Sequence, residues 1–492
     1  MSLPSLFEKK ISYNLSFLSD KTKVNCSFFE KEFARMRQKK HLGFTSLRKA
    51  LSDCFNRIPD KRQASKVNHR LHDALMSGFA CMHFQDPSLL QFQERLQKKH
   101  HRSNMQSLFD IQSVPESAQL RSIIDEVESD YFAPFFEEYF HRLQRGKYLE
   151  QYQLFPELYL CSLDGTQYFS SGSVSCAGCL TTKHKKKVSQ GDADEICEHD
   201  EEGKISYSHK VLQAAIMHPD VRQVIPLMPE EISNMDGQTK QDCEINAAKR
   251  LIPKIRKAHP QLGIILGGDD LFSRQPMIEE VKKARMHYIF SVKPGSHKYM
   301  MGWLKAYPEL HKKESIDSKG VRHVYRWMNN VPLHGGEDSI NVNYFEYQMI
   351  KTEKNGKEKI VFRNSWITDF EITKNSIDQL VRGGRCRWKI ENECFNTLKN
   401  QGYCIEHNYG HGEKNLCFNF YLLTLIAFSF HQVFELTDAL YQQCRKALGS
   451  KKNMWDHVRA YVKLFIFDTW EALLMFVINP EDYLPDKSPS NI

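Results

Sequence analysis

Two short apolar segments of the chain each end in an acidic residue. Leu158–Leu163 is followed directly by Asp164, and Leu262–Leu266 is followed by two glycines and Asp269. Open α/β sheets bind their ligands at strand ends, where the turn exposes a side chain that the sheet holds in place. An aspartate there also serves as a turn residue or helix cap, and Asp270 competes with Asp269 for any chemical role.

A third acid lies far along the chain, in a segment that reads as a helix. Arg387–Asn400 (RWKIENECFNTLKN) contains Arg387 and Glu391 four residues apart, which places both side chains on one helical face. Glu393 is rotated by about 200° from Glu391, so the two cannot face the same partner. Ile390, Cys394 and Leu398 form an apolar stripe that is expected to be buried, and Glu391 borders this stripe. Glu391 is therefore the expected active-site acid, and Glu393 is the alternative.

Carboxylates from distant positions are what two-metal phosphodiester chemistry needs. Mg²⁺ binds oxygen ligands and keeps several waters, so two or three carboxylates suffice. Two such ions about 3.5–4 Å apart activate a water or 3′-hydroxyl and stabilise charge on the attacked and leaving oxygens. Asp164, Asp269 and Glu391 are therefore candidate ligands for two Mg²⁺ or Mn²⁺ ions.

A second set of candidate ligands contains cysteine and histidine. Cys176 and Cys179 have the Cys-x-x-Cys spacing of zinc sites, which either Cys197 with His199, or His209, could complete. Ordinary reduced cysteines are the alternative. His407 and His411 also lie four apart, in EHNYGHG, but the glycines around them predict a loop, and a structural or DNA-contact role is expected rather than a metal.

The elements that must position these residues change along the chain. Residues 1–150 read as helical, as in Val114–Val127 with its apolar residues at helical spacing. From residue 157 short strands are predicted: Leu158–Leu163, then Gln167–Ser171 after a turn at Gly165, then Tyr207–Met217. Three strands, a helix over Asp242–Ala258 and strands alternating with helices predict a mixed α/β sheet.

Residues 320–368 interrupt this alternation with β-rich sequence. Asn355-Gly356 lies between two strand-like runs and predicts a hairpin. After Asp369 the chain reads as helical. The most apolar stretch, Leu416–Leu436, is long enough for a membrane span but carries polar residues, which predicts a buried helix.

Composition indicates a cytoplasmic protein with a polyanionic partner. The 492 residues predict two or three domains, and the net charge of +8 is a mild basic excess. The positive charge is concentrated in Arg35–His41, Lys98–Arg102 and Lys183–Lys187, and the alternative for each cluster is a solvated loop. Thirteen scattered cysteines suit reduced thiols, and the first ten residues lack the apolar core of a secretory signal.

Taken together, SLDGTQYFSS, ILGGDDLF and RWKIE resemble the DDE transposases of bacterial insertion sequences. The closest resemblance is to the group with a Tyr-x2-Arg-x3-Glu-x6-Lys signature, over roughly residues 158–412. That resemblance implies an RNase H-like catalytic core with a β-rich insertion before the glutamate, and an N-terminal helical domain. It implies metal-dependent cleavage at element ends and strand transfer into target DNA.

The family's roles carry over by position. Asp164, Asp269 and Glu391 match the three acids, with Phe272 as the aromatic residue after the second Asp. Arg387 matches the signature arginine. The signature tyrosine falls at Gly384, and the signature lysine falls at Leu398, one residue before Lys399. Arg387 and Lys399 would contact DNA phosphates. Trp327, in the insertion, would stack on a flipped base if it is not a packed core residue.

The predicted organisation has three parts. Residues 1–150 form a helical DNA-binding domain in which Arg35, Arg37, Lys39 and Lys40 contact DNA. Residues 151–435 form the catalytic domain, with the β-rich insertion at about 300–368, and residues 436–492 form a helical C-terminal segment. The expected partners are double-stranded DNA and a second copy of the chain, with no membrane. The alternatives are a nuclease without strand transfer and an inactive DNA-binding relative.

Overall fold

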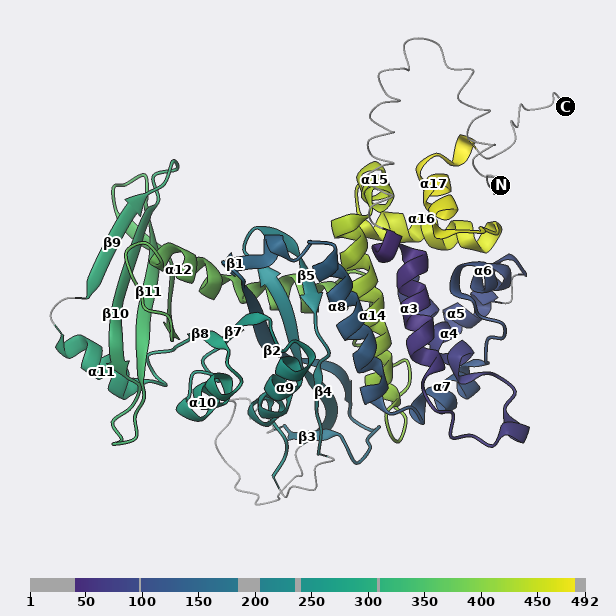
Figure 1. The fold of residues 1–492 in the computed structure, drawn as a ribbon, viewed down its shortest axis with the longest axis horizontal. Helices are drawn as coiled ribbons and strands as arrows, with labels where there is room; N and C mark the ends of the chain where they lie inside the picture. The colour runs from purple at the N-terminus through teal and green to yellow at the C-terminus, as the bar shows by residue number, and fades with distance from the viewer. Residues whose placement is uncertain (1–39, 97–98, 185–203, 235–239, 308–309, 483–492) are drawn as a thin grey trace, which may run out of the picture.

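The computed structural model describes residues 40–96, 99–184, 204–234, 240–307 and 310–482. The molecule is elongated (Figure 1), with a β-rich end, a central sheet covered by helices, and an all-helical end. The strands are β1 (Gln153–Phe155), β2 (Leu158–Ser171), β3 (Leu180–Lys183), β4 (Ile205–His218), β5 (Val221–Pro226), β6 (Glu230–Ile232), β7 (Gly263–Gly268), β8 (His287–Ser291), β9 (His311–Ile316), β10 (Arg322–Pro332), β11 (Asn341–Thr352) and β12 (Glu358–Thr368).

The helices fall into three groups along the chain. Those before the sheet are α3 (Phe44–Asn56), α4 (Leu71–His83), α5 (Leu89–Leu96), α6 (Lys99–Phe109), α7 (Ser117–Asp125) and α8 (Ala133–Arg145). Those between strands are α9 (Glu244–Ala258), α10 (Gln275–Lys283) and α11 (Lys298–Ala306). Those after the last strand are α12 (Ile377–Cys386), the π-helical η8 (Ile390–Phe395), α13 (Asn396–Asn400), α14 (Leu416–Thr437), α15 (Ala439–Leu448), α16 (Lys451–Leu464) and α17 (Trp470–Ile478).

The strands form one mixed sheet in the order β3-β4-β2-β7-β8-β12-β11-β10-β9. β4 runs antiparallel to β2, and β5 antiparallel to β4, whereas β7 runs parallel to β2, and β8 parallel to β7. The helix α9 precedes β7 and packs a stripe of buried alanine, leucine and isoleucine side chains inward. The predicted mixed α/β architecture is confirmed at this level.

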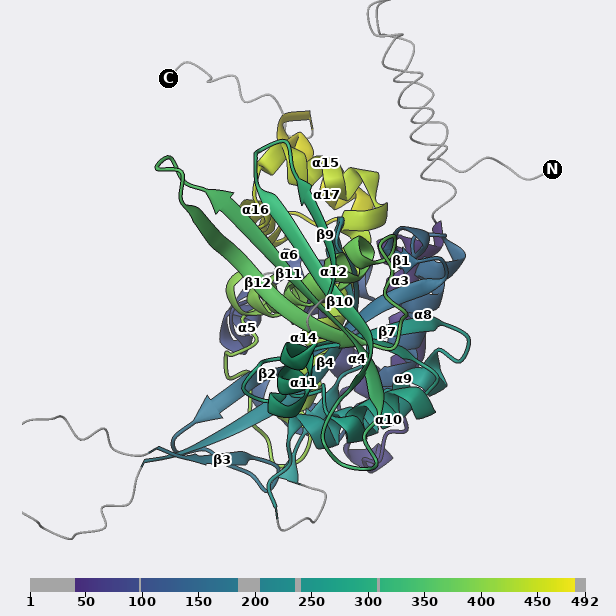
Figure 2. The same cartoon turned by 90° about the vertical axis from the view of Figure 1, so that its left-hand side faces the viewer.

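The β-rich segment extends the same sheet beyond β8. β12 pairs with β8, and β9 to β12 form an antiparallel meander at the end of the molecule opposite the helical end (Figure 1); this meander faces the viewer in Figure 2. The predicted hairpin is present: Thr352 pairs with Glu358, and Gly356 takes a positive φ of 78°, which a glycine adopts without steric cost. This segment separates β8 from the helix α12 in the chain.

The helices before residue 150 share one hydrophobic core with the C-terminal helices. α14 packs against α4 and α7 on one side and against β5 on the other, and α16 packs against α6. α14 is long and apolar enough to cross a membrane, but its most apolar window is 94% buried inside the protein. It is the buried core helix that the sequence predicts.

One predicted break in the sheet is wrong. The sequence predicts a turn at Gly165 between two strands, but β2 runs unbroken through Asp164 and Gly165. The reason is the long partner β4, whose Gln213 and Leu212 pair with these two residues. The third strand of the meander is therefore β5, which the sequence pattern did not predict.

Candidate active site

The pairing of β2 with β7 places Asp164 and Asp269 toward the same ends of two neighbouring strands. The register runs from Leu158 opposite Gly263 to Ser162 opposite Gly267. Asp164 lies two residues after Ser162 on β2, and Asp269 lies two residues after Gly267, directly beyond the end of β7. A Cβ added at Gly267 would lie 2.8 Å from Ser162 Oγ, so these paired positions face one side of the sheet. Since side chains alternate along a strand, Asp164, two residues after Ser162 on β2, lies on that same side.

Arg387 contacts both Asp164 and Glu391. Its Nη1 lies 3.2 Å from Asp164 Oδ2, and its Nη2 donates a hydrogen bond of 2.7 Å to Glu391 Oε1. Arg387 and Asp164 are mostly buried, and Glu391 is more exposed. One guanidinium therefore contacts a carboxylate from β2 and a carboxylate from the π-helical turn η8, more than 200 residues later in the chain.

The helix that carries Glu391 is wound as a π-helix over Ile390–Phe395. Such wide turns are rare and occur often at functional sites. Ile390 and Cys394 are fully buried and anchor this turn in the core. Glu393 points elsewhere, with its Oε2 3.3 Å from Nε of the exposed Arg222. Glu391, and not Glu393, thus lies beside Asp164.

The two adjacent aspartates after β7 have different surroundings. Asp270 Oδ1 accepts hydrogen bonds of 2.6 Å from both Lys293 N and Ser296 Oγ, which ties it to the loop after β8. Asp269 Oδ1 accepts one bond of 2.9 Å from Leu271 N, as in a tight turn. Asp270 therefore holds the loop after β8 in place, whereas Asp269 lies close enough to Glu244 to act on its charge.

A fourth acid, Glu244, lies at this place and was not predicted from the sequence. It is the first residue of α9, and its carboxylate occupies the space that a side chain at position 165 would fill, so Gly165 lets Glu244 approach β2 closely. Burial raises the pKa of Glu244, and the charge of Asp269 raises it further. The available signal was an acid in the first turn of a helix, where the helix dipole favours negative charge.

We call Asp164, Glu244, Asp269 and Glu391 the acidic cluster. Burial raises the pKa of Asp164 to about 7; Arg387 opposes this shift, and Glu391 and Glu244 add to it. The negative charge of the cluster thus exceeds what one guanidinium neutralises. Carboxylate oxygens in this setting suit a divalent cation such as Mg²⁺. In the described residues no three of these carboxylates converge within 4.8 Å, and Arg387 contacts both Asp164 and Glu391.

Other predicted residues lie elsewhere. Lys399 on α13 pairs with Glu406, its Nζ 2.8 Å from Oε1. Trp327 on β10 is only 5% exposed and stacks on His311 with ring centroids 5.6 Å apart, so a base would have to displace His311 to reach that face. Both rings line a depression of about 450 Å³.

The remaining predictions concern the N-terminus and the cysteines. Arg35, Arg37 and Lys39 lie outside the described residues, and Lys40 begins a short helix, Lys40–Leu42, with its side chain not described. Cys197 and His199 also lie outside them. Cys176 and Cys179 lie side by side, in contact with two histidines, His209 and His411.

The acidic cluster has the donors for phosphodiester chemistry. Its oxygens suit divalent cations, and Arg387 offers the planar fork that matches a phosphate.

In comparisons with known proteins, no protein-family model and no curated protein matches the chain.

Proposed function

We propose that this protein is a DDE-type transposase that cleaves DNA at element ends and joins them to target DNA. The observation that carries the proposal is the contact of Arg387 with both Asp164 and Glu391, with Asp269 directly after β7, the strand paired with β2. Three acids in this order, with a β-rich segment before the last one, are what the sequence resemblance implies.

The topology of the sheet supports an RNase H-like core. The meander β2-β4-β5 is followed by α9, β7, α10 and β8, with β7 and β8 parallel to β2. This is the succession of three strands, a helix and alternating strands and helices expected for that core. Asp164 lies on β2, the first strand of this succession, and Asp269 follows directly after β7, its fourth strand.

The residues of the acidic cluster would hold two Mg²⁺ or Mn²⁺ ions, with Asp164, Asp269 and Glu391 as ligands. When bound, such ions activate the attacking oxygen and stabilise the leaving one. Asp164 has a raised pKa, so its ionised form gains from a neighbouring cation. Arg387 orients Asp164 and Glu391 and would bind a DNA phosphate.

The proposal extends to partners and location. Double-stranded DNA would be bound by the helical N-terminal region and its basic clusters, with two copies of the chain on paired ends. The location would be the cytoplasm, in association with the nucleoid. A nuclease that stops at hydrolysis is the enzyme alternative, and an inactive DNA-binding relative is the other; the presence of all three acids argues against the latter.

The test is a cleavage and strand-joining assay with the purified full chain. The donor plasmid carries the native DNA that flanks the reading frame encoding this protein. With Mg²⁺ the wild type should nick the flanks and join the freed 3′-ends to target DNA. Asp164→Asn and Asp269→Asn should abolish both steps. Asp270→Asn is the matched control, because an amide oxygen still accepts the bonds from Lys293 and Ser296.

Each outcome discriminates among the candidates. Nicking without joining would favour the nuclease. Binding of the flanks without nicking, in Mg²⁺ and in Mn²⁺, would establish the inactive relative and overturn the proposal. Loss of nicking in Asp270→Asn with full activity in Asp269→Asn would reassign the second acid.

A further inference from the structure

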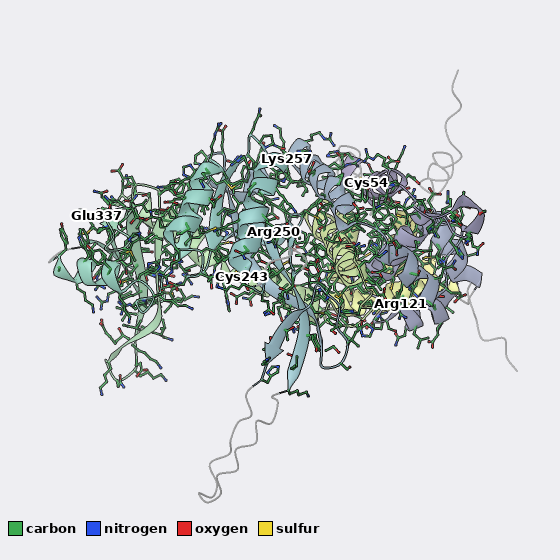
Figure 3. All side chains as sticks on the ribbon, turned by 90° about the horizontal axis from the view of Figure 1, so that it is seen from below. Cys54, Arg121, Cys243, Arg250, Lys257 and Glu337 are labelled. Carbon is green, nitrogen blue, oxygen red and sulfur yellow. The ribbon has the colours of Figure 1, made fainter. Side chains whose placement is uncertain are left out.

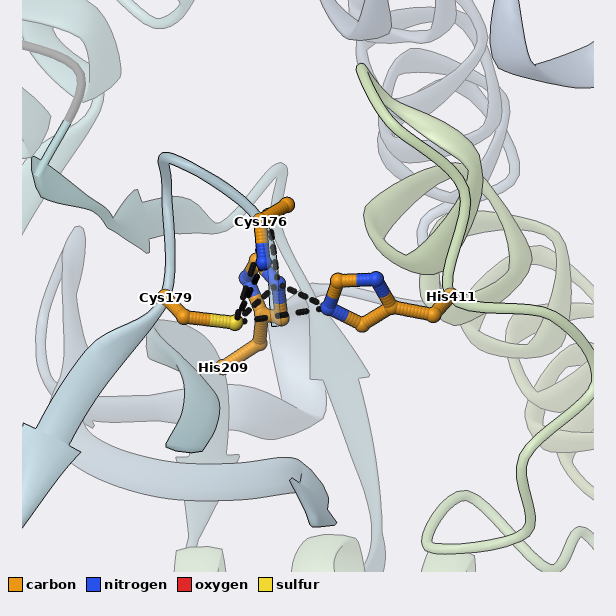
Figure 4. Close-up of side chains that lie close together, drawn as sticks. All are labelled: Cys176, Cys179, His209 and His411. Atoms are coloured by element: carbon orange, nitrogen blue, oxygen red, sulfur yellow. Dashed lines mark hydrogen bonds between the residues drawn. The ribbon is translucent and has the colours of Figure 1, made fainter. Parts of the chain in front are cut away.

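Four side chains from three separate parts of the chain converge away from the acidic cluster (Figure 4). Cys176 and Cys179 lie on the turn between β2 and β3, His209 lies on β4, and His411 lies on the segment before α14. One ligand atom from each lies within 4.8 Å of all the others. β3, which follows the turn of the two cysteines, is the edge strand of the sheet (Figure 2) and pairs with β4.

The spacings match a tetrahedral zinc ion. Bonds of about 2.3 Å to sulfur and 2.0–2.1 Å to nitrogen place tetrahedral ligand atoms about 3.8 Å apart for two sulfurs, about 3.6 Å for sulfur and nitrogen, and about 3.3 Å for two nitrogens. The two Sγ atoms are 3.9 Å apart, and His209 Nε2 lies 3.4 Å from each. His411 Nε2 lies 3.3 Å from Cys179 Sγ and 3.2 Å from His209 Nε2.

Each imidazole has a carboxylate or carbonyl oxygen near its second nitrogen. His411 Nδ1 lies 2.9 Å from the carbonyl oxygen of Gly412, to which it donates when Nε2 is free to bind a metal. His209 Nδ1 lies 3.3 Å from Glu231 Oε1, and Tyr168 donates a hydrogen bond of 2.7 Å to that same oxygen. A carboxylate or carbonyl behind each histidine is the usual second layer of a zinc site.

The turn that carries the two cysteines is also shaped for sharing a metal. Cys179 N donates to Cys176 O at 3.2 Å, which closes the turn, and Cys176 N lies 3.5 Å from Cys179 Sγ as a donor to that sulfur. A separation of 3.9 Å between the sulfurs is far longer than a disulfide bond, about 2.05 Å. The cysteines are therefore placed as a pair of ligands.

We propose that Cys176, Cys179, His209 and His411 bind one Zn²⁺ ion in a closed, structural site. The four protein ligands fill the tetrahedron, so no position is left for a reacting water. The ion connects β2, the strand that carries Asp164, to the segment that leads from the helix of Glu391 into α14. By connecting these two segments, the ion stabilises the elements that carry Asp164 and Glu391, and it takes no part in the chemistry of the acidic cluster. The zinc proposal does not depend on the proposed function.

The test is the zinc content of the full chain, purified without a metal-binding tag and measured by mass spectrometry of the metal. We expect about one zinc per chain in the wild type, and loss of most of it in Cys176→Ser and His411→Ala. Cys243→Ser and His407→Ala are the matched controls and should keep the zinc. Cys243, labelled in Figure 3, is exposed before α9, and His407 is not one of the four proposed ligands. Cobalt in place of zinc should give the absorption of a tetrahedral thiolate site.

A second measurement covers variants that fail to fold. In the wild type, Cys176 and Cys179 should resist alkylation until a chelator is added, whereas Cys243 should react at once. A zinc-free wild type from zinc-supplemented cells would overturn the proposal. So would zinc retained in both ligand variants, alkylation unaffected by the chelator, or a disulfide between Cys176 and Cys179.

Discussion

Arg387 contacts Asp164 and Glu391 at once, through Nη1 at 3.2 Å and Nη2 at 2.7 Å. The contact to Glu391 spans four residues of one helix, whereas the contact to Asp164 joins that helix to the central sheet. Because the guanidinium is planar and rigid, the two contacts fix the direction of both carboxylates. Glu391 is thus oriented into the acidic cluster, and Glu393 is not.

Glu391→Gln should abolish Mg²⁺-dependent cleavage and leave binding of element ends intact, because it removes a ligand charge and not a DNA contact. The matched variant is Glu393→Gln, which loses only a surface pair with Arg222, worth less than about 1 kcal/mol of stability. Cleavage and end binding measured on both variants decide the assignment. If Glu393→Gln destroys cleavage and Glu391→Gln does not, the motif match must move by two residues.

Glu244→Gln should raise the Mg²⁺ concentration needed for half-maximal cleavage by roughly 10-fold or more, the usual effect of losing a group that supports metal ligands. The physical reason is the removal of one negative charge beside Asp164 and Asp269. The control is Glu279→Gln, on the exposed face of α10. A Mg²⁺ titration that coincides for Glu244→Gln and the wild type would remove Glu244 from the acidic cluster's function.

The helical part should lose stability as the pH falls below about 6.5. His83 is fully buried among aromatic rings, and burial lowers its pKa to about 3. Between these values the unfolded chain binds a proton at this histidine and the folded chain does not. Stability is therefore fully present above a pH of about 6.5 and decreases by up to about 1.4 kcal/mol per pH unit below it.

The variant His83→Phe isolates this effect, since it keeps a ring in the aromatic core and cannot be protonated. Thermal unfolding at about pH 7.5 and about pH 5.5, on either side of the ordinary histidine pKa, should show a smaller drop in Tm for the variant. Part of the drop should remain, because the pKa of the neighbouring buried His431 is lowered as well. Equal drops in variant and wild type would contradict the assignment to His83.

Neutralising Arg35, Arg37, Lys39 and Lys40 together should weaken DNA binding and flatten its dependence on salt. Each phosphate that the variant no longer neutralises reduces the slope of log K against log salt by about 0.9. The control replaces exposed lysines at the helical end, Lys446 and Lys452. Binding measured at several salt concentrations is the readout, and an unchanged slope in the fourfold variant would place the DNA-binding residues elsewhere.

Much of the local structure followed from the sequence alone. The strand before Asp269, the hairpin at Asn355-Gly356 and the buried helix at 416–437 are each set by the pattern of neighbouring apolar and turn-forming residues. The same holds for the helical segment of Arg387 and Glu391, whose four-residue spacing puts both on one face. Such patterns involve residues that are close together in the sequence, so they can be recognised without knowledge of the tertiary structure.

Contacts between distant residues needed the tertiary structure. Gly165 reads as a turn residue, but the pairing of β2 with β4 keeps it extended, and its missing side chain instead makes room for Glu244. His411 reads as part of a loop, yet the packing of the segment before α14 brings it to Cys179 and His209. The sequence determined which residues could act as acids or ligands; only the packing of strands and helices decided which of them meet, because spacing along the chain does not specify proximity across it.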